Sequence, residues 1–159
     1  EVLQAVSAEI GAGRTGIRLS PMTTCSDTPR DSDPQALHQY VVEGLAPLGL
    51  AYVHVIEGET GGPRVPADAP VAFDYGALRR RWPGAWMVNN GYTRASALAA
   101  VADGSADAVA FGRPFISNPD LVRRLREQAP LNDLRADKLY GGGAEGYIDY
   151  PFLGDAAPA

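Results

Sequence analysis

The stretch "DAVAFGRPFISNPDLV", residues 107–122, predicts a short buried strand, then a loop, then a helix. Its first residues are mostly apolar, and Asn118 and Pro119 are typical of the N-cap and first position of a helix. Between strand and helix, Gly112 allows close approach to the backbone, and Arg113 adds a fixed positive charge. A glycine and an arginine at such a junction are suited to holding a phosphate.

Upstream of this stretch, the sequence repeats the order of a short apolar strand followed by a helix. Apolar strands that alternate with helices predict a parallel α/β sheet covered by helices. Four such units suit a small open sheet or half of a (β/α)8 barrel, whose usual length is ~250 residues. No linker is visible, so we expect a single domain over residues 1–159. The expected strands are residues 15–20, 51–56, 85–89 and 107–111, and the expected helices begin near Asp33, Phe73, Thr93 and Asn118.

The composition limits the classes of partner. With 45% hydrophobic residues and a net charge of -5, the chain is an ordinary globular protein, and no nucleic acid or anionic membrane partner is expected. No apolar run approaches the ~20 residues needed to cross a bilayer. The one cysteine, Cys25, excludes an internal disulfide and fits a cytoplasmic location. His38 and His54 have no Cys or carboxylate at ligand spacing, so no metal site is predicted.

The beginning of the chain is unusual for a natural start. The first residue is Glu1 rather than methionine. Val2, Leu3, Val6 and Ile10 already share one face of a helix. We therefore expect a fragment, or a processed or engineered chain.

Glycines and polar residues follow two neighbouring strands at the ends where ligands bind in parallel sheets. One end carries Asn89, Asn90 and Gly91, and the next carries Gly112 and Arg113. Their backbone N–H groups and the guanidinium can converge on one anion. Either end alone is better explained as a turn glycine or a solvated charge, but the two together favour a phosphate site.

Arg18 lies within the first expected strand, on the side opposite to Ile17 and Leu19. A charge in that position is costly unless it meets a negative partner, which is either a neighbouring carboxylate or a ligand that becomes anionic. His54 is best explained as a packed, hydrogen-bonded core residue. Cys25, in the loop after the first strand, either lines a pocket or is inert.

Four segments occur in a familiar order and spacing: "GIRLSP", "NNGYT", "DAVAFGRPFISNPDLV" and "LYGGGAEGYIDYP". Through them the chain resembles the C-terminal half of the Old Yellow Enzyme family, the FMN-dependent ene-reductases and NAD(P)H:flavin oxidoreductases. The resemblance implies strands five to eight of a (β/α)8 TIM barrel that carries FMN.

The resemblance also implies roles for particular residues. Tyr140 takes the place of the aromatic residue near the flavin and substrate. Cys25 and Ser26 fall in the loop over the substrate pocket, with Cys25 where phenylalanine is frequent. The implied cofactor-binding residues are Arg18 beside flavin N1 and O2, Asn89, Asn90 and Gly91 at the FMN phosphate, and Gly112 and Arg113 at the same phosphate.

The implied reaction is reduction of FMN by NADPH or NADH, followed by reduction of a small-molecule activated alkene. In the family, the residues that grip the substrate and donate the proton lie in the N-terminal half. We therefore expect this chain to hold no catalytic residue and to be inactive alone. Its open strand edges favour pairing with a complementary N-terminal half-barrel or self-association. The alternatives are another FMN or phosphate-binding barrel enzyme, and a non-catalytic truncated half-barrel.

Overall fold

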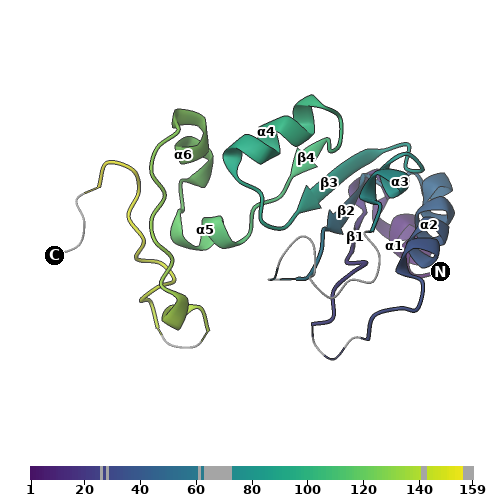
Figure 1. Ribbon diagram of the computed structural model, residues 1–159, viewed down its shortest axis with the longest axis horizontal. Helices are drawn as coiled ribbons and strands as arrows, with labels where there is room; N and C mark the ends of the chain where they lie inside the picture. The colour runs from purple at the N-terminus through teal and green to yellow at the C-terminus, as the bar shows by residue number, and fades with distance from the viewer. Residues whose placement is uncertain (26, 28, 61, 63–72, 141–142, 156–159) are drawn as a thin grey trace. The chain divides into compact units, whose positions relative to one another are not determined.

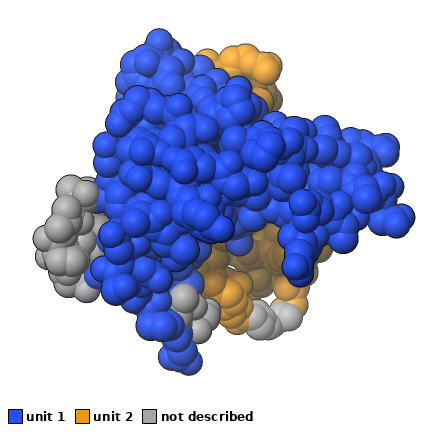
Figure 2. Space-filling model, turned by 90° about the vertical axis from the view of Figure 1, so that its right-hand side faces the viewer, with its two compact units in different colours: residues 1–110 blue, residues 111–159 orange. Residues whose placement is uncertain are grey.

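The protein forms two compact units, residues 1–110 (unit 1) and 111–159 (unit 2), which are coloured separately in Figure 2. Each unit is described by itself, and the expected single domain stays a prediction. The computed structural model describes residues 1–25, 27, 29–60, 62, 73–140 and 143–155.

Unit 1 contains a parallel sheet with the strand order β1-β2-β3-β4 (Figure 1). Each strand pairs with the next one along the chain, which is the arrangement that successive strand–helix units produce. The predicted parallel α/β order is therefore confirmed, although three strands are shorter than expected. The strands are β1 (Gly16–Leu19), β2 (Tyr52–Ile56), β3 (Ala85–Asn89) and β4 (Ala108–Val109).

Two helices of unit 1, α2 and α4, begin at capping residues that the sequence identifies. The Asp33 side chain accepts a hydrogen bond from the Ala36 N–H at the start of α2. Thr93 and Ser96 cap α4 reciprocally through side chain and backbone. Both predicted starts are confirmed, whereas α3 is shorter than the expected helix. The helices are α1 (Val2–Ile10), α2 (Pro34–Leu45), α3 (Tyr75–Arg79) and α4 (Arg94–Ala102), with 3-10 turns η1 (Ala12–Arg14) and η2 (Ala46–Leu48).

The core of unit 1 lies between the sheet and these helices. The side chains of Val42, Leu78 and Ala100 bring α2, α3 and α4 against one face of the sheet. We call this face the covered face. It presents Val53, Val55, Trp86 and Val88, all fully buried.

The opposite face of the sheet carries several polar side chains and stays partly exposed. Because side chains alternate along a strand, it receives the residues between those of the covered face. Arg18, His54, Met87 and Ala108 form one row across the four strands, and Asn89 follows Met87 on the same side. Arg18 is exposed and the others are half-buried. We call this the open face.

Unit 2 is held together by a buried arginine on its longer helix. The Arg124 guanidinium contacts Asp120 Oδ1 at 2.6 Å and donates to the carbonyl oxygens of Pro130 and Pro151 at 2.6 and 3.0 Å. These bonds tie the helix to two later segments of the chain. Unit 2 contains α5 (Arg113–Ser117), α6 (Leu121–Glu127) and the 3-10 turn η3 (Ala136–Lys138).

The predicted helix start at Asn118 is wrong. Helix α5 begins directly after Gly112, and Asn118 follows its end, so that Asp120 is the N-cap of α6. The Asn118 carboxamide instead donates to the Pro114 carbonyl and accepts from the Asn132 N–H at 2.7 Å. A side chain used in tertiary hydrogen bonds is not available to cap the following helix. Within the described parts of the chain, no helix is long and apolar enough to cross a membrane.

Candidate cofactor site

The strand-end segment, residues 89–92, is fixed by hydrogen bonds to Glu57, the buried residue that follows β2. The Glu57 N–H donates to the Asn89 carbonyl at 3.1 Å, and Asn90 Nδ2 donates to the Glu57 carbonyl at 2.6 Å. The Tyr92 hydroxyl donates to Glu57 Oε2 at 2.9 Å. One residue therefore holds the segment at three points, which is the kind of support that a preorganised binding site needs.

The backbone of the strand-end segment exposes hydrogen-bond donors at the carboxyl end of the sheet. Asn90 and Gly91 both have positive φ, 104° and 65°. For Asn90 this conformation is strained, and its side-chain bonds to the carbonyls of Glu57 and Glu59 help to hold it. Among the described residues, neither the Asn90 nor the Gly91 N–H finds an acceptor. These N–H groups are therefore suited to an anion, whereas the Asn90 side chain is occupied within the protein.

Arg18, His54 and Asn89 form a polar group on the open face. His54 Nε2 lies 2.9 Å from Asn89 Oδ1, and Arg18 is the register partner of His54 on β1. The described part of the chain contains no ion pair or hydrogen bond to the Arg18 guanidinium. No carboxylate partner of Arg18 is found among these residues, and its assignment to a ligand contact stays a prediction.

His54 is hydrogen-bonded, as expected, but it lies half-buried on the open face rather than in the core. Burial lowers its pKa below the ordinary value, the Asn89 hydrogen bond opposes this, and the charge of Arg18 lowers the pKa further. The imidazole is therefore neutral at pH 7. In that state, Nε2–H donates to Asn89 Oδ1.

Gly112 and Arg113 begin unit 2. Gly112 has φ -101°, a value open to any residue, and a Cβ built there would meet no atom of the described residues beyond its own neighbours within 4 Å. Neither the backbone conformation nor packing against the described residues requires a glycine at this position. Arg113 is the exposed first residue of α5. That Gly112 and Arg113 bind the same phosphate as residues 89–91 stays a prediction.

The residues expected near the substrate are only partly described. Cys25 is exposed in the loop after β1, with its Sγ 3.4 Å from Thr23 Oγ1. Tyr140 in unit 2 is 93% exposed. Ser26 lies outside the described residues. The assignment of these three residues to a substrate pocket stays a prediction.

The sequence analysis missed Glu57, Tyr92 and the Asn89 contact to His54. A signal for Glu57 was present, because an acidic residue directly after the apolar strand "YVHVI" needs a buried hydrogen-bond partner. The identity of that partner was not visible, since Tyr92 lies 35 residues away along the chain.

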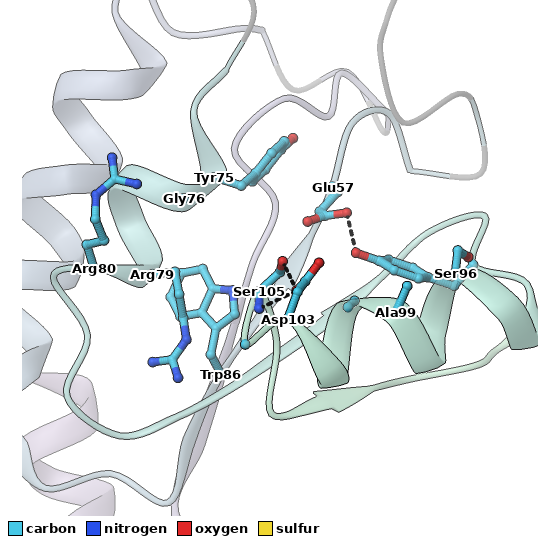
Figure 3. A pocket seen from close by; sticks show the side chains of 13 residues that line it. Glu57, Tyr75, Gly76, Arg79, Arg80, Trp86, Ser96, Ala99, Asp103 and Ser105 are labelled. Atoms are coloured by element: carbon cyan, nitrogen blue, oxygen red, sulfur yellow. Dashed lines mark hydrogen bonds between the residues drawn. The ribbon is translucent and has the colours of Figure 1, made fainter.

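A cleft of about 560 Å³ opens near α3 and α4, on the covered side of the sheet (Figure 3). Trp86 and Ala100 supply apolar surface, and Glu57, Arg79 and Asp103 supply charges. Among the residues that line this cleft, none belongs to the predicted cofactor or substrate set. Because Trp86 faces the helices, the cleft lies across the sheet from the open face, and it shares with the candidate cofactor site only Glu57 and Tyr92, which hold the strand-end segment.

A parallel sheet with helices on one face and ligand-binding groups at the carboxyl ends of its strands is characteristic of (β/α)-barrel enzymes. The chain matches the NADH:flavin oxidoreductase / NADH oxidase family over residues 1–132 and belongs to that family, the Old Yellow Enzymes. The resemblance predicted from the sequence is therefore confirmed.

Individual relatives agree with this assignment. Putative 12-oxophytodienoate reductase 12 from Oryza sativa subsp. japonica is 44% identical over 163 residues, covering 98% of this chain and 39% of that protein. The old yellow enzyme from Trypanosoma cruzi has a TM-score of 0.86 and 34% identity, covering 96% of this chain and 38% of that one. Morphinone reductase in complex with tetrahydroNAD has a TM-score of 0.82 and 40% identity, covering 96% of this chain and 39% of that one. The chain thus spans about 40% of the length of these relatives.

Proposed function

We propose that this chain is the cofactor-binding half of an FMN-dependent ene-reductase and supplies strands five to eight of the barrel. NADH or NADPH is the reductant, and an alkene conjugated to a carbonyl or nitro group is the substrate. The proposal is supported by the family, by the reductase names of the relatives and by the complex of morphinone reductase with tetrahydroNAD.

The observation that carries the proposal is the guanidinium of Arg18 on the open face. Bound FMN would take up a hydride from the nicotinamide and pass it to the alkene. Arg18 would stabilise the negative charge that reduction places near flavin N1. Neutral His54 adds no second positive charge to this region at pH 7.

The phosphate end of the cofactor is assigned to backbone donors and one arginine. The Asn90 and Gly91 N–H groups offer two hydrogen bonds without rearrangement, because Glu57 already holds the segment. Asn89, whose side chain is bonded to His54, is assigned to the same phosphate through its backbone. In unit 2, Gly112 is proposed to bind phosphate through its backbone, and Arg113 through a charge-assisted hydrogen bond.

We further propose that this chain alone does not reduce enones, and that a complementary N-terminal half completes the site. The proposal rests on the family resemblance, which implies that the residues that grip the substrate and donate the proton lie in the N-terminal half. The edges of β1 and β4 are where further strands would pair.

A flavin titration tests the assignment of the phosphate site. FMN fluorescence is followed as the chain is added, with and without an N-terminal half taken from the rice relative. Arg113→Ala should weaken FMN binding by about tenfold or more, because a charge-assisted hydrogen bond is worth roughly 1.5–3 kcal/mol. Arg123→Ala is the control, since Arg123 is an exposed arginine of the same unit that bonds to Glu127 and to the Leu153 carbonyl and is not assigned to the phosphate.

Unchanged FMN affinity in Arg113→Ala would contradict the phosphate assignment. FMN binding by the completed protein without NAD(P)H-dependent reduction of cyclohexenone would favour the alternative of another flavin barrel enzyme. Reduction of cyclohexenone by this chain alone would contradict its role as an inactive half.

A further inference from the structure

Tyr92 anchors the strand-end segment on the covered side of the sheet. Its hydroxyl donates to Glu57 Oε2 at 2.9 Å, and both residues line the cleft beside Trp86 (Figure 3). The Tyr92 ring also packs against the buried core of unit 1. Glu57 is 8% exposed, so a hydrogen bond to its acidic group offsets part of the cost of its burial. The contact is therefore part of the interior rather than of the open face.

The residues before Gly91 are held to the same point by other bonds. The Glu57 N–H donates to the Asn89 carbonyl at 3.1 Å, which continues the pairing of β2 with β3. Asn90 Nδ2 donates to the Glu57 carbonyl at 2.6 Å. These bonds use the backbone of Glu57, whereas Tyr92 uses its side chain. Gly91 thus lies between two anchors on one residue, and its φ of 65° turns the chain between them.

The two anchors orient the N–H groups of Asn90 and Gly91. Neither group donates to an acceptor among the described residues, so their direction is set by the bonds on either side. Donors that are already oriented bind an anion more tightly, because no free energy is needed to order them. Loss of the anchor after Gly91 would therefore weaken the hold on a phosphate but not on the flavin ring.

We propose that Tyr92, through its bond to Glu57, is a positioning residue that makes the site prefer a phosphorylated flavin to an unphosphorylated one. This inference rests on the proposed function, which assigns the Asn90 and Gly91 N–H groups to the FMN phosphate. Tyr92 acts from the covered side of the sheet without contact to the cofactor. Because an acidic group does not attract a phosphate, the contribution of Glu57 is geometric rather than electrostatic.

The ratio of FMN affinity to riboflavin affinity measures this preference, because riboflavin is the same flavin without the phosphate. Both affinities are obtained from flavin fluorescence, for the chain completed with the N-terminal half of the rice relative. Tyr92→Phe should lower the ratio about three- to tenfold, as the loss of one hydrogen bond predicts, with riboflavin affinity unchanged. Tyr40→Phe is the matched control, since Tyr40 lies on α2 and is 77% exposed, and its ratio should not change.

Two uncharged variants of Glu57 separate the contact from the charge. Glu57→Gln keeps an oxygen that can accept from the Tyr92 hydroxyl, whereas Glu57→Leu does not. Both keep the backbone bonds to Asn89 and Asn90. The ratio should be about three- to tenfold lower in Glu57→Leu than in Glu57→Gln. Adding Tyr92→Phe should lower the ratio in the Glu57→Gln variant and leave it unchanged in the Glu57→Leu variant.

Inorganic phosphate tests the same donors in this chain alone, without a flavin. The backbone amide signals of Asn90 and Gly91 are followed by nuclear magnetic resonance as phosphate is added. Half of the shift should require about three- to tenfold more phosphate in Tyr92→Phe than in the unaltered chain. Circular dichroism spectra establish that each variant is folded before it is titrated.

An unchanged ratio in Tyr92→Phe would overturn the proposal, and so would equal ratios in the two Glu57 variants. An equal loss of FMN and riboflavin affinity would also overturn it, because Tyr92 would then only stabilise the fold. The same holds if phosphate does not shift the two amide signals of the unaltered chain. Signals that respond as expected in a chain that binds no FMN would refute the proposed function and leave the role of Tyr92 intact.

Discussion

The two faces of the sheet in unit 1 differ although the same strands build both. On the covered face, Val53 and Val55 are 0% exposed and Trp86 and Val88 are 1% exposed. On the open face, Arg18 is exposed and His54 is half-buried. The covered face contributes apolar burial to stability, whereas the open face keeps polar groups available for a ligand. Alternation along each strand lets one short segment serve both purposes.

The largest expected effect compares two neighbouring residues of β3 that point to opposite faces. Trp86→Ala should lower the free energy of unfolding by roughly 3–5 kcal/mol, because it empties a buried site. Met87→Ala should cost less than about 1 kcal/mol, because Met87 is only half-buried on the open face. Urea denaturation gives the free energy of unfolding of each variant. Circular dichroism follows unfolding in both variants, and tryptophan fluorescence also follows it in Met87→Ala. Equal losses would mean that the two faces do not differ in their contribution to stability.

Arg18→Gln tests whether a residue of the open face contributes to FMN binding without contributing to the stability of the fold. The guanidinium has no ion-pair partner among the described residues, so the free energy of unfolding should change by no more than about 0.5 kcal/mol. FMN affinity of the completed protein should fall by about tenfold or more, because a charged contact to the flavin is lost. A large loss of stability with unchanged FMN affinity would mean that Arg18 has a structural role.

The smallest effect concerns the protonation of His54. Proton NMR can follow its ring signals, and a His38→Gln variant assigns them, since the chain has two histidines. The pKa of His54 should lie below 6.5, mainly because of burial, and should rise in Arg18→Gln, which removes a nearby positive charge. It should fall further in Asn89→Ala, which removes the opposing hydrogen bond.

The same shift predicts a dependence of stability on pH. Since the folded state keeps His54 neutral, the unfolded chain binds the proton first as the pH drops below 6.5. The contribution of His54 to stability is therefore complete above this pH and decreases until the pKa of the folded state is reached. Urea midpoints at pH 7.5 and 5.5 measure the difference, which should disappear in His54→Gln. A pKa at or above 6.5 would contradict this account.

Much of the fold could be predicted because its signals are local. Asp33 and Thr93 cap helices through bonds to residues three positions away, so their spacing alone identifies both starts. Arg18 could be placed opposite Ile17 and Leu19 for the same reason. The prediction at Asn118 was wrong because its side chain bonds to Asn132, fourteen residues away. A helix-capping preference depends on local sequence and does not include such a contact.

The candidate site divides in the same way. The sequence by itself determined the alternation of strands and helices, the helix caps and the residue types at the strand ends, because each depends on neighbours within a few positions. Only the tertiary structure decided that Asn90 grips Glu57 and Glu59, that Asn89 meets His54 and that Glu59 reaches Thr23. These partners are 31 to 36 residues apart along the chain, and the register of the parallel strands brings them together.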